Sequence, residues 1–154
     1  MSDRKHLTRR ALGAHLSALT LALGGLGVTL RVNAADDSLY RALGGEEGIA
    51  RISTGLVARV YADERIKHLF QETNPRFLEQ VQLRKQFCEL AAGPCTYDGE
   101  TMKNSHAKLG ITKAHFNALV EDLQLEMQAQ GVAFSAQNRL LALLAPMHRD
   151  IITR

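Results

Sequence analysis

Apolar side chains recur at three- and four-residue intervals from about residue 38 to residue 151, and this spacing constrains the fold more than any other feature. Such spacing places the apolar side chains on one stripe of a helix, whereas a half-buried strand would need alternation every two residues. No run with the two-residue period, no internal repeat and no low-complexity stretch interrupts the pattern. The sequence therefore predicts an all-α fold.

Glycine, proline and capping residues divide the helical pattern into six segments. Ser38, Thr112 and Ser135 precede apolar stripes and are expected to open helices, and Asn74 does the same ahead of a proline at the first helical position. Pro146 lies inside the last stripe and should kink it. The predicted helices cover about residues 38–43, 49–62, 75–92, 102–109, 113–130 and 135–151.

The first 34 residues have the three-part layout of a secretory signal. Residues 1–10 are basic, residues 11–30 are apolar and rich in glycine, and Val32-Asn33-Ala34 offers small side chains to a signal peptidase. We expect cleavage after Ala34, which leaves one domain of residues 35–154 and a periplasmic or secreted protein.

The run Thr8-Arg9-Arg10-Ala11-Leu12 resembles the twin-arginine export signal, although Gly13 stands where a lysine is often found. The general secretory route is the second possibility. An uncleaved membrane anchor is the third, but His15 and four glycines leave this stretch short and weakly hydrophobic for a bilayer span.

The charge of the chain is concentrated in this leader. The formal net charge is +3, yet residues 1–34 carry five basic side chains against one acidic, so residues 35–154 hold 14 Lys and Arg against 15 Asp and Glu, a net charge of −1. A nucleic-acid-binding domain would need a basic surface. We therefore expect no nucleic-acid partner for the domain.

Among the histidines, His106 has the most informative context. It shares a stripe with Met102 and Leu109 on a very short predicted helix, so its ring should point into the apolar interior, whereas His115 and His148 are expected to be exposed. A lone histidine on an apolar face is more often a hydrogen-bonded core residue than a metal ligand. The stripe alone leaves both roles open.

Several motifs, separated by consistent spacings, resemble the group 1 truncated haemoglobins over residues 38–153. The matching residues are Leu39-Tyr40, Gly44-Gly45, Val57-Ala58-Arg59-Val60, Ala62-Asp63, Phe70, Ala92-Gly93-Pro94, Tyr97-Asp98-Gly99, Met102, His106 and Leu109-Gly110-Ile111-Thr112. The resemblance implies a two-over-two helical sandwich around one haem b, with His106 as the proximal iron ligand and Phe70 on the porphyrin face. The further cofactor contacts that it implies are Phe87, Tyr97, Met102, Leu109 and Ile111.

On the distal side the chain departs from the family pattern. Val57 stands where group 1 proteins usually carry a tyrosine, and Tyr61 follows one helical turn later. Counting along the third helix places Glu79 and Leu83 at the distal positions. The loop before that helix is one residue longer than usual, and a shift by one residue would instead place Leu78 and Gln82 there. Ala92 also replaces the first glycine of the usual Gly-Gly-Pro loop.

Two arrangements are open for the two cysteines. Cys88 and Cys95 could form a disulfide in an oxidising compartment, while a buried Cys88 with a separate Cys95 is the commoner arrangement.

The leading functional hypothesis is reversible binding of O2, NO or CO at a haem. A second hypothesis is a haem enzyme for nitric oxide dioxygenation or peroxide reduction. Such an enzyme would need a separate reductase, because the chain has no flavin or nicotinamide motif. The third hypothesis is a cofactor-free helical interaction module.

Overall fold

The computed structural model describes residues 36–154, so the predicted export signal and its cleavage site lie outside the described residues. Every regular element in this range is helical, and none of these helices has the length and apolar character needed to cross a bilayer. The elements are α1 (Ser38–Ala42), α2 (Gly45–Ala62), η1 (Lys67–Phe70), α3 (Pro75–Phe77), η2 (Leu78–Leu83), α4 (Arg84–Leu90), α5 (Met102–His106), α6 (Lys113–Ala129), α7 (Phe134–Leu144), η3 (Ala145–Met147) and α8 (His148–Ile151).

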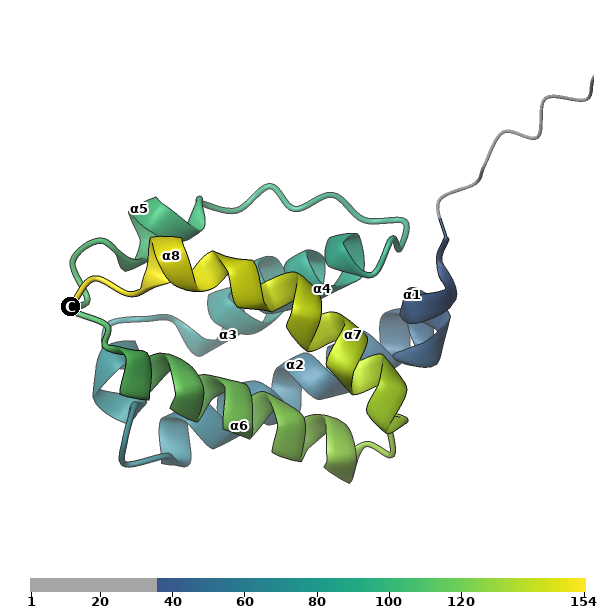
Figure 1. Cartoon of the computed structure of the whole chain (residues 1–154), viewed down its shortest axis with the longest axis horizontal. Coiled ribbons are helices and arrows are strands. Elements are labelled where there is room, and N and C mark those ends of the chain that lie inside the picture. Colours follow the sequence, from purple (N-terminus) through teal and green to yellow (C-terminus); the bar gives the residue numbers. More distant parts are fainter. Residues whose placement is uncertain (1–35) are drawn as a thin grey trace, which may run out of the picture. The chain divides into compact units, whose positions relative to one another are not determined.

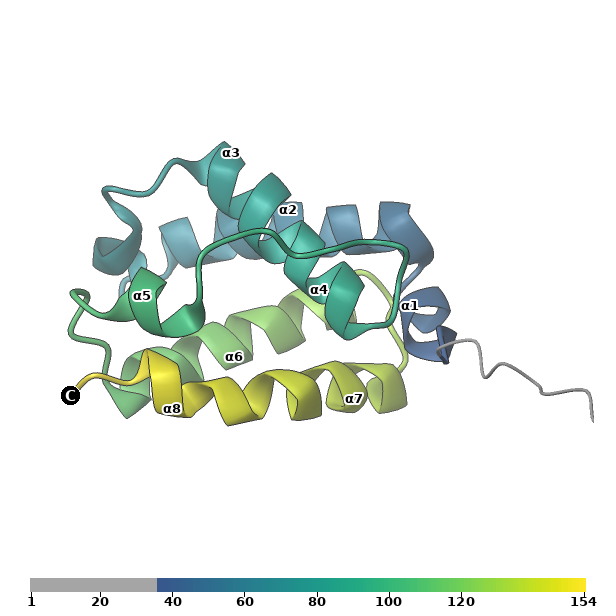
Figure 2. The ribbon, with the colours of Figure 1, turned by 90° about the horizontal axis from the view of Figure 1, so that it is seen from above.

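The helices form two layers (Figures 1 and 2). Figure 2 shows α2 in one layer with the helix that runs from α3 to α4, and α6 in the other layer with α7 and α8. The stripe predicted on α2 is buried between the layers, where Ile52, Leu56 and Val60 pack in one core cluster with Met127 of α6 and Leu140 of α7. This is the two-over-two arrangement that the sequence resemblance implies.

A glycine faces a buried carboxylate where α2 crosses α6. A Cβ atom at Gly55 would overlap the carboxylate of Glu126, so a larger residue there would displace the end of that side chain. Glu126 is almost fully buried, and it accepts a hydrogen bond of 2.8 Å from Arg59 Nε. The ion pair thereby satisfies the carboxylate at the helix crossing.

Several predicted helix boundaries hold, but α2 begins at Gly45 and not at residue 49, α5 ends at His106 and not at residue 109, and η1 was not predicted. Two predicted caps are also wrong. Asn74 Oδ1 accepts from the backbone of Arg76 and Phe77 as predicted, and Thr112 caps α6. Ser38, in contrast, is already the first residue of α1, because the side chain of Asp36 accepts its backbone N–H. Ser135 likewise lies inside α7, which begins one residue earlier at Phe134.

Pro146 interrupts the last predicted helix as expected. The α-helical pattern stops at Leu144, passes through the 3-10 turn η3 and resumes as α8 at His148. A proline lacks the N–H that would continue the α-helical ladder.

The third predicted helix is not uniform. Residues Leu78–Leu83 form the π-helical segment η2 between α3 and α4. A π-helical turn holds about one residue more than an α-helical turn, because its hydrogen bonds run from residue i to i+5. Over this segment, side chains therefore follow a different register from the one that α-helical counting predicts.

A strap of residues 91–101 connects α4 to α5. At its start, Ala92 has a left-handed φ of +58°, and the N–H of Gly93 donates to Cys88 O at 2.8 Å. Cys88 and Cys95 form a disulfide, with 5.9 Å between their Cα atoms. The commoner arrangement of separate thiols is therefore wrong for this chain. Further along the strap, Asp98 pairs with Lys85 of α4 at 2.7 Å.

Candidate functional site

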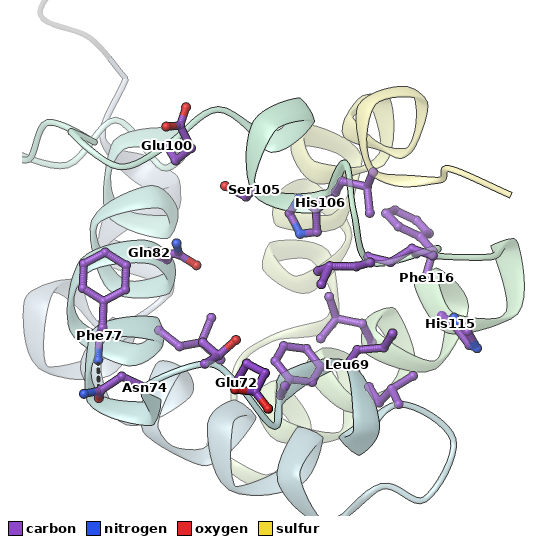
Figure 3. A pocket seen from close by; sticks show the side chains of 18 residues that line it. Leu69, Glu72, Asn74, Phe77, Gln82, Glu100, Ser105, His106, His115 and Phe116 are labelled. Carbon is purple, nitrogen blue, oxygen red and sulfur yellow. Dashed lines mark hydrogen bonds between the residues drawn. The ribbon is translucent and has the colours of Figure 1, made fainter.

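Two adjoining pockets lie between the layers and beneath α5. The larger has a volume of about 410 Å³ and the smaller about 120 Å³. Figure 3 shows the larger pocket, with Gln82 and His106 pointing into it from different elements. The residues common to both pockets are Phe70, Leu78, Gln82, Ser105, His106, Phe116, Leu119 and Ile151.

His106 enters this cavity from the last position of α5. That one-turn helix is fixed at its start by Thr101, whose Oγ1 accepts from the N–H of Asn104 at 3.2 Å. His106 Nδ1 lies 2.6 Å from the carbonyl oxygen of Met102. Since a carbonyl only accepts, Nδ1 carries the hydrogen, and the neutral ring keeps its lone pair on Nε2. The ring therefore offers a free nitrogen base to the cavity.

The opposite side of the cavity follows the shifted register of the third helix. Leu78 and Gln82 line both pockets, and Leu83 lines the smaller one. Glu79 lies outside the lining of either pocket, and its Oε1 accepts from Thr54 Oγ1 of α2 at 2.9 Å. The π-helical segment explains why Glu79 is misplaced by one residue, whereas Leu83, the other residue of the counted register, does line the smaller pocket.

The two α2 residues predicted for the distal side also lie outside the lining. Val57 is buried elsewhere in the helix interface. The hydroxyl of Tyr61 is engaged by the backbone of the segment after η1, lying 3.0 Å from Phe70 O and 2.7 Å from Thr73 O. Burial raises the pKa of Tyr61, so the hydroxyl stays protonated and donates. Its role here is to hold the turn that carries Phe70.

Of the predicted cofactor contacts, all but Tyr97 reach the cavity. Phe70 lines both pockets, Phe87 and Met102 line the smaller one, and Leu109 and Ile111 line the larger one. The ring of Tyr97 packs over Gly99 on the strap. Its hydroxyl donates to Glu100 O at 2.8 Å, outside the lining of both pockets.

Sequence reasoning missed several lining residues. Phe116 and Leu119 belong to the apolar stripe predicted for α6. An apolar stripe predicts burial, but it does not distinguish side chains that pack in the core from side chains that line a cavity. His115, expected to be exposed, is half-buried at the rim of the larger pocket. Its Nδ1 accepts from Thr112 N–H at 3.4 Å, which completes a reciprocal cap. A histidine three residues after a capping threonine was the available signal for this contact.

Comparison with known proteins identifies the family. The model for bacterial-like globins matches residues 38–153. The chain belongs to the bacterial-like globin family. It is 32% identical over 116 residues to the group 1 truncated hemoglobin GlbN of Mycolicibacterium paratuberculosis, covering 75% of this chain and 85% of the relative. It is also 32% identical over 124 residues to GlbN of a Synechocystis species, covering 76% and 98%.

Solved structures agree with this assignment. The crystal structure of the truncated hemoglobin of Tetrahymena pyriformis in its Fe(III) form aligns with a TM-score of 0.72 and 27% identity, covering 75% of this globin and 98% of that chain. The predicted all-α, two-over-two fold is thereby confirmed. Family membership also confirms haem as the cofactor and the general function of binding a diatomic gas, and it argues against a cofactor-free module.

The cavity of this globin fits a haem on its own chemistry. Pockets for organic cofactors are mostly apolar clefts of about 300–1,000 Å³ with a few polar groups. Here most of the lining is aromatic or aliphatic, with a few polar side chains, and two imidazoles reach it: His106, whose Nδ1 contacts Met102 O, and His115, whose Nδ1 caps α6 at Thr112. The polar side chain of Gln86 contacts thioether sulfur atoms, since its Nε2 lies 3.6 Å from Met102 Sδ and 3.7 Å from Met147 Sδ.

Proposed function

We propose that this globin binds one haem b through His106 and reversibly binds O2 or another diatomic gas, with Gln82 as the hydrogen-bond donor in the distal pocket. The observation that carries the proposal is the 2.6 Å contact between His106 Nδ1 and Met102 O. This contact orients the ring and leaves Nε2 as the free base at the cavity. Backbone carbonyls that accept from the other ring nitrogen orient metal-ligating histidines in the same way.

The two sides of the cavity have different proposed roles, iron binding at His106 and hydrogen bonding to the gas ligand at Gln82. Haem iron bound at His106 supplies an open coordination position at which O2, NO or CO binds. Gln82 reaches the cavity from the opposite side, and its amide can donate a hydrogen bond to a polarised gas ligand. Val57 has no donor, and the hydroxyl of Tyr61 is committed to Phe70 O and Thr73 O. Gln82 is therefore the donor that we assign.

Replacing the proximal ligand tests this function directly. His106→Gly should abolish the Soret band of the purified protein, because no other nitrogen base with this orientation lines the pocket, and added imidazole should restore the band. His148 provides a matched control. Its Nδ1 also contacts a backbone carbonyl, Ala145 O at 2.8 Å, but its ring is exposed and lies outside the cavity lining. His148→Ala should retain haem, and a normal Soret band in His106→Gly would overturn the proposal.

We also propose that the protein is exported, as the leader sequence predicts. The disulfide between Cys88 and Cys95 supports export, since disulfides persist in oxidising compartments such as the periplasm and are rare in the cytosol. Exchanging Arg9 and Arg10 for lysine tests the route. The haem-loaded form should then accumulate inside the cell, whereas undiminished export would exclude the twin-arginine pathway.

Gas binding and turnover can be separated in the same purified protein. A carrier releases O2 unchanged and oxidises NO once. Nitrate formation that continues over many cycles with an added reductase would instead assign an enzyme and a separate electron-donor partner.

A further inference from the structure

We propose that the disulfide of Cys88 and Cys95 is a thiol-exchange site, and that attack by a small thiol at Cys95 opens it and loosens the strap that positions His106. The chemistry of the disulfide stands on the structure alone. The consequence for haem retention rests on the proposed function of His106.

The disulfide lies in an open groove on the face of α4 away from the haem cavity. The groove has a volume of about 510 Å³, which is room for a thiol the size of an amino acid or a short peptide. It is lined by Glu46, Ile49, Gln80, Arg84, Lys85, Cys88, Pro94, Cys95 and Thr96.

The two sulfur atoms differ in accessibility. The side chain of Cys88 lies on the buried face of α4 and is 2% exposed, whereas Cys95 is half-buried on the strap. Gly93 closes the approach to Cys88, since a Cβ at that position would lie 2.7 Å from Cys88 Sγ and 2.5 Å from the ring of Tyr40. An incoming thiol therefore meets Cys95 first.

Exchange at Cys95 proceeds in two balanced steps. A thiolate attacks Cys95 Sγ, a new S–S bond forms, and the bond to Cys88 breaks with Cys88 leaving as a thiolate. A second thiol molecule then attacks the mixed disulfide, so Cys95 leaves as a thiol and the two attacking thiols are released as one oxidised disulfide. Arg84 and Lys85 precede Cys88 by four and three residues on the same helix and line the same groove. Both cations are already paired, Arg84 with Glu46 at 2.8 Å and Lys85 with Asp98 at 2.7 Å, so the exchange depends on the accessibility of Cys95 and not on a net positive charge beside the leaving thiolate.

The strap has few other attachments to α4. Among the described residues, the polar contacts that link residues 94–101 to α4 are the two hydrogen bonds from Lys85 Nζ to the carboxylate of Asp98. The hydroxyl of Tyr97 bonds within the strap, and Glu100 bonds forward to Thr101 and Asn104 of the α5 cap. Opening the disulfide therefore leaves two polar contacts between α4 and the segment that leads to His106: the exposed ion pair of Lys85 with Asp98, and the weak contact of Gln86 Nε2 with Met102 Sδ.

Single-cysteine variants test the site of attack without reference to haem. Cys88→Ser leaves Cys95 as the only thiol, and Cys95→Ser leaves Cys88. In the apo proteins, Cys95 should react with 5,5′-dithiobis(2-nitrobenzoate) at least tenfold faster than Cys88, with equal reactivity in urea as the control. Comparable rates in the folded variants, or two free thiols in the native protein isolated without reductant, would overturn the proposal.

Amide exchange and haem loss test the consequence. Treating the native protein with 2-mercaptoethanol should raise amide exchange over residues 94–106 and speed haem transfer to an excess of apomyoglobin by about tenfold. The Cys88→Ser/Cys95→Ser variant should show the faster rate with or without thiol, and Asp98→Asn should keep its thiol response. If reduction left amide exchange over residues 94–106 unchanged, the proposal that opening the disulfide loosens the strap would be refuted. This outcome can be read even in a protein that fails to bind haem. Haem binding with a transfer rate that is insensitive to thiol would refute the link to His106.

Discussion

His106 reaches the cavity from a five-residue helix suspended between the strap and Gly110, whereas Gln82 reaches it from a helical segment that continues through α3, η2 and α4 over residues 75–90. On the proximal side, one local hydrogen bond between residues four apart fixes the ring. On the distal side, the position of Gln82 depends on how many residues each helical turn contains. The proximal side thus depends on local spacing, and the distal side on helical register.

This difference separates two kinds of stability. The distal helix packs on α2 along η2 and α4 and shares the main core, with Phe87 buried toward its C-terminal end. Within the strap and α5, Ala91 at the very start is the one fully buried side chain, so the rest of this segment gains its order from the disulfide, the ion pair of Asp98, the packing of α5 on α8 and the cofactor. Regions with few buried apolar contacts open at low free energy. His106 therefore lies on the less stable side of the cavity.

The largest effect in this comparison is expected at Gln82. Gln82→Leu should accelerate O2 release by about tenfold to a hundredfold, because a hydrogen bond to a charged acceptor contributes about 1.5–3 kcal/mol. Stopped-flow release of O2 measures this, and CO release should change little. Gln80→Leu is the matched control, since Gln80 lies on the same π-helical segment but lines the groove on the other face. If the two variants behave alike, the assigned distal register is incorrect.

Removing the Tyr61 hydroxyl should affect folding more than gas binding. Tyr61→Phe leaves the carbonyl groups of Phe70 and Thr73 without this donor and should lower the free energy of unfolding by about 1.5 kcal/mol. Urea unfolding of the apo protein measures the loss. O2 release should remain within about twofold of the parent rate, and a tenfold acceleration would instead make Tyr61 the distal donor.

A substitution at the root of the strap should stabilise the protein. Ala92 has a φ of +58°, a conformation that costs a residue with a Cβ about 1 kcal/mol relative to glycine. Ala92→Gly should therefore raise the free energy of unfolding by about 1 kcal/mol. The neighbouring Ala91 has a φ of −83° and a buried methyl group, so Ala91→Gly should destabilise the protein instead. A loss of stability in both variants would contradict the left-handed geometry of Ala92.

The smallest effect concerns two carboxyl groups with opposite pKa shifts. Burial, and then the charge of Asp63, raise the pKa of Asp122 on α6, while the hydrogen bonds from Lys85 lower the pKa of Asp98 on the strap. The burial of ionised Asp122 therefore lowers the free energy of unfolding at neutral pH, and this loss shrinks as the pH falls toward the raised pKa. The ion pair of Asp98 raises the free energy of unfolding at neutral pH, and this gain is lost as the pH falls below the usual aspartate range.

Comparing unfolding free energies between pH 3 and pH 7 checks this sign. Relative to the parent, Asp122→Asn should gain the most stability at pH 7, and Asp98→Asn should lose the most stability at that pH. The predicted signs would be refuted if either difference grew on acidification.

The sequence predicted the proximal side well because its information is local. The stripe of Met102, His106 and Leu109 placed the imidazole inside and located the start of the short helix, although α5 ends at His106 and not at the predicted residue 109. Helix boundaries elsewhere failed at Ser38, where Asp36 accepts the backbone N–H, at Ser135, which lies inside α7, and at residue 49, since α2 already begins at Gly45.

The distal register could not be read in the same way. A π-helical turn in η2 has no composition that distinguishes it from the α-helical turns around it, so the counted register assigned Glu79 where Leu78 faces the cavity. The commitment of Tyr61 to two carbonyl groups is also a tertiary contact, formed with a segment nine to twelve residues away. Neither fact is encoded by spacing along one helix.

The disulfide also bears on how nitric oxide would react with this protein. The chain has two cysteines in all, and both are consumed in one bond, so the oxidised protein has no thiol to form an S-nitrosothiol. Any nitric oxide taken up by the oxidised form must then reside at the cofactor, and a titration with the gas counts haem sites without a competing reaction at sulfur.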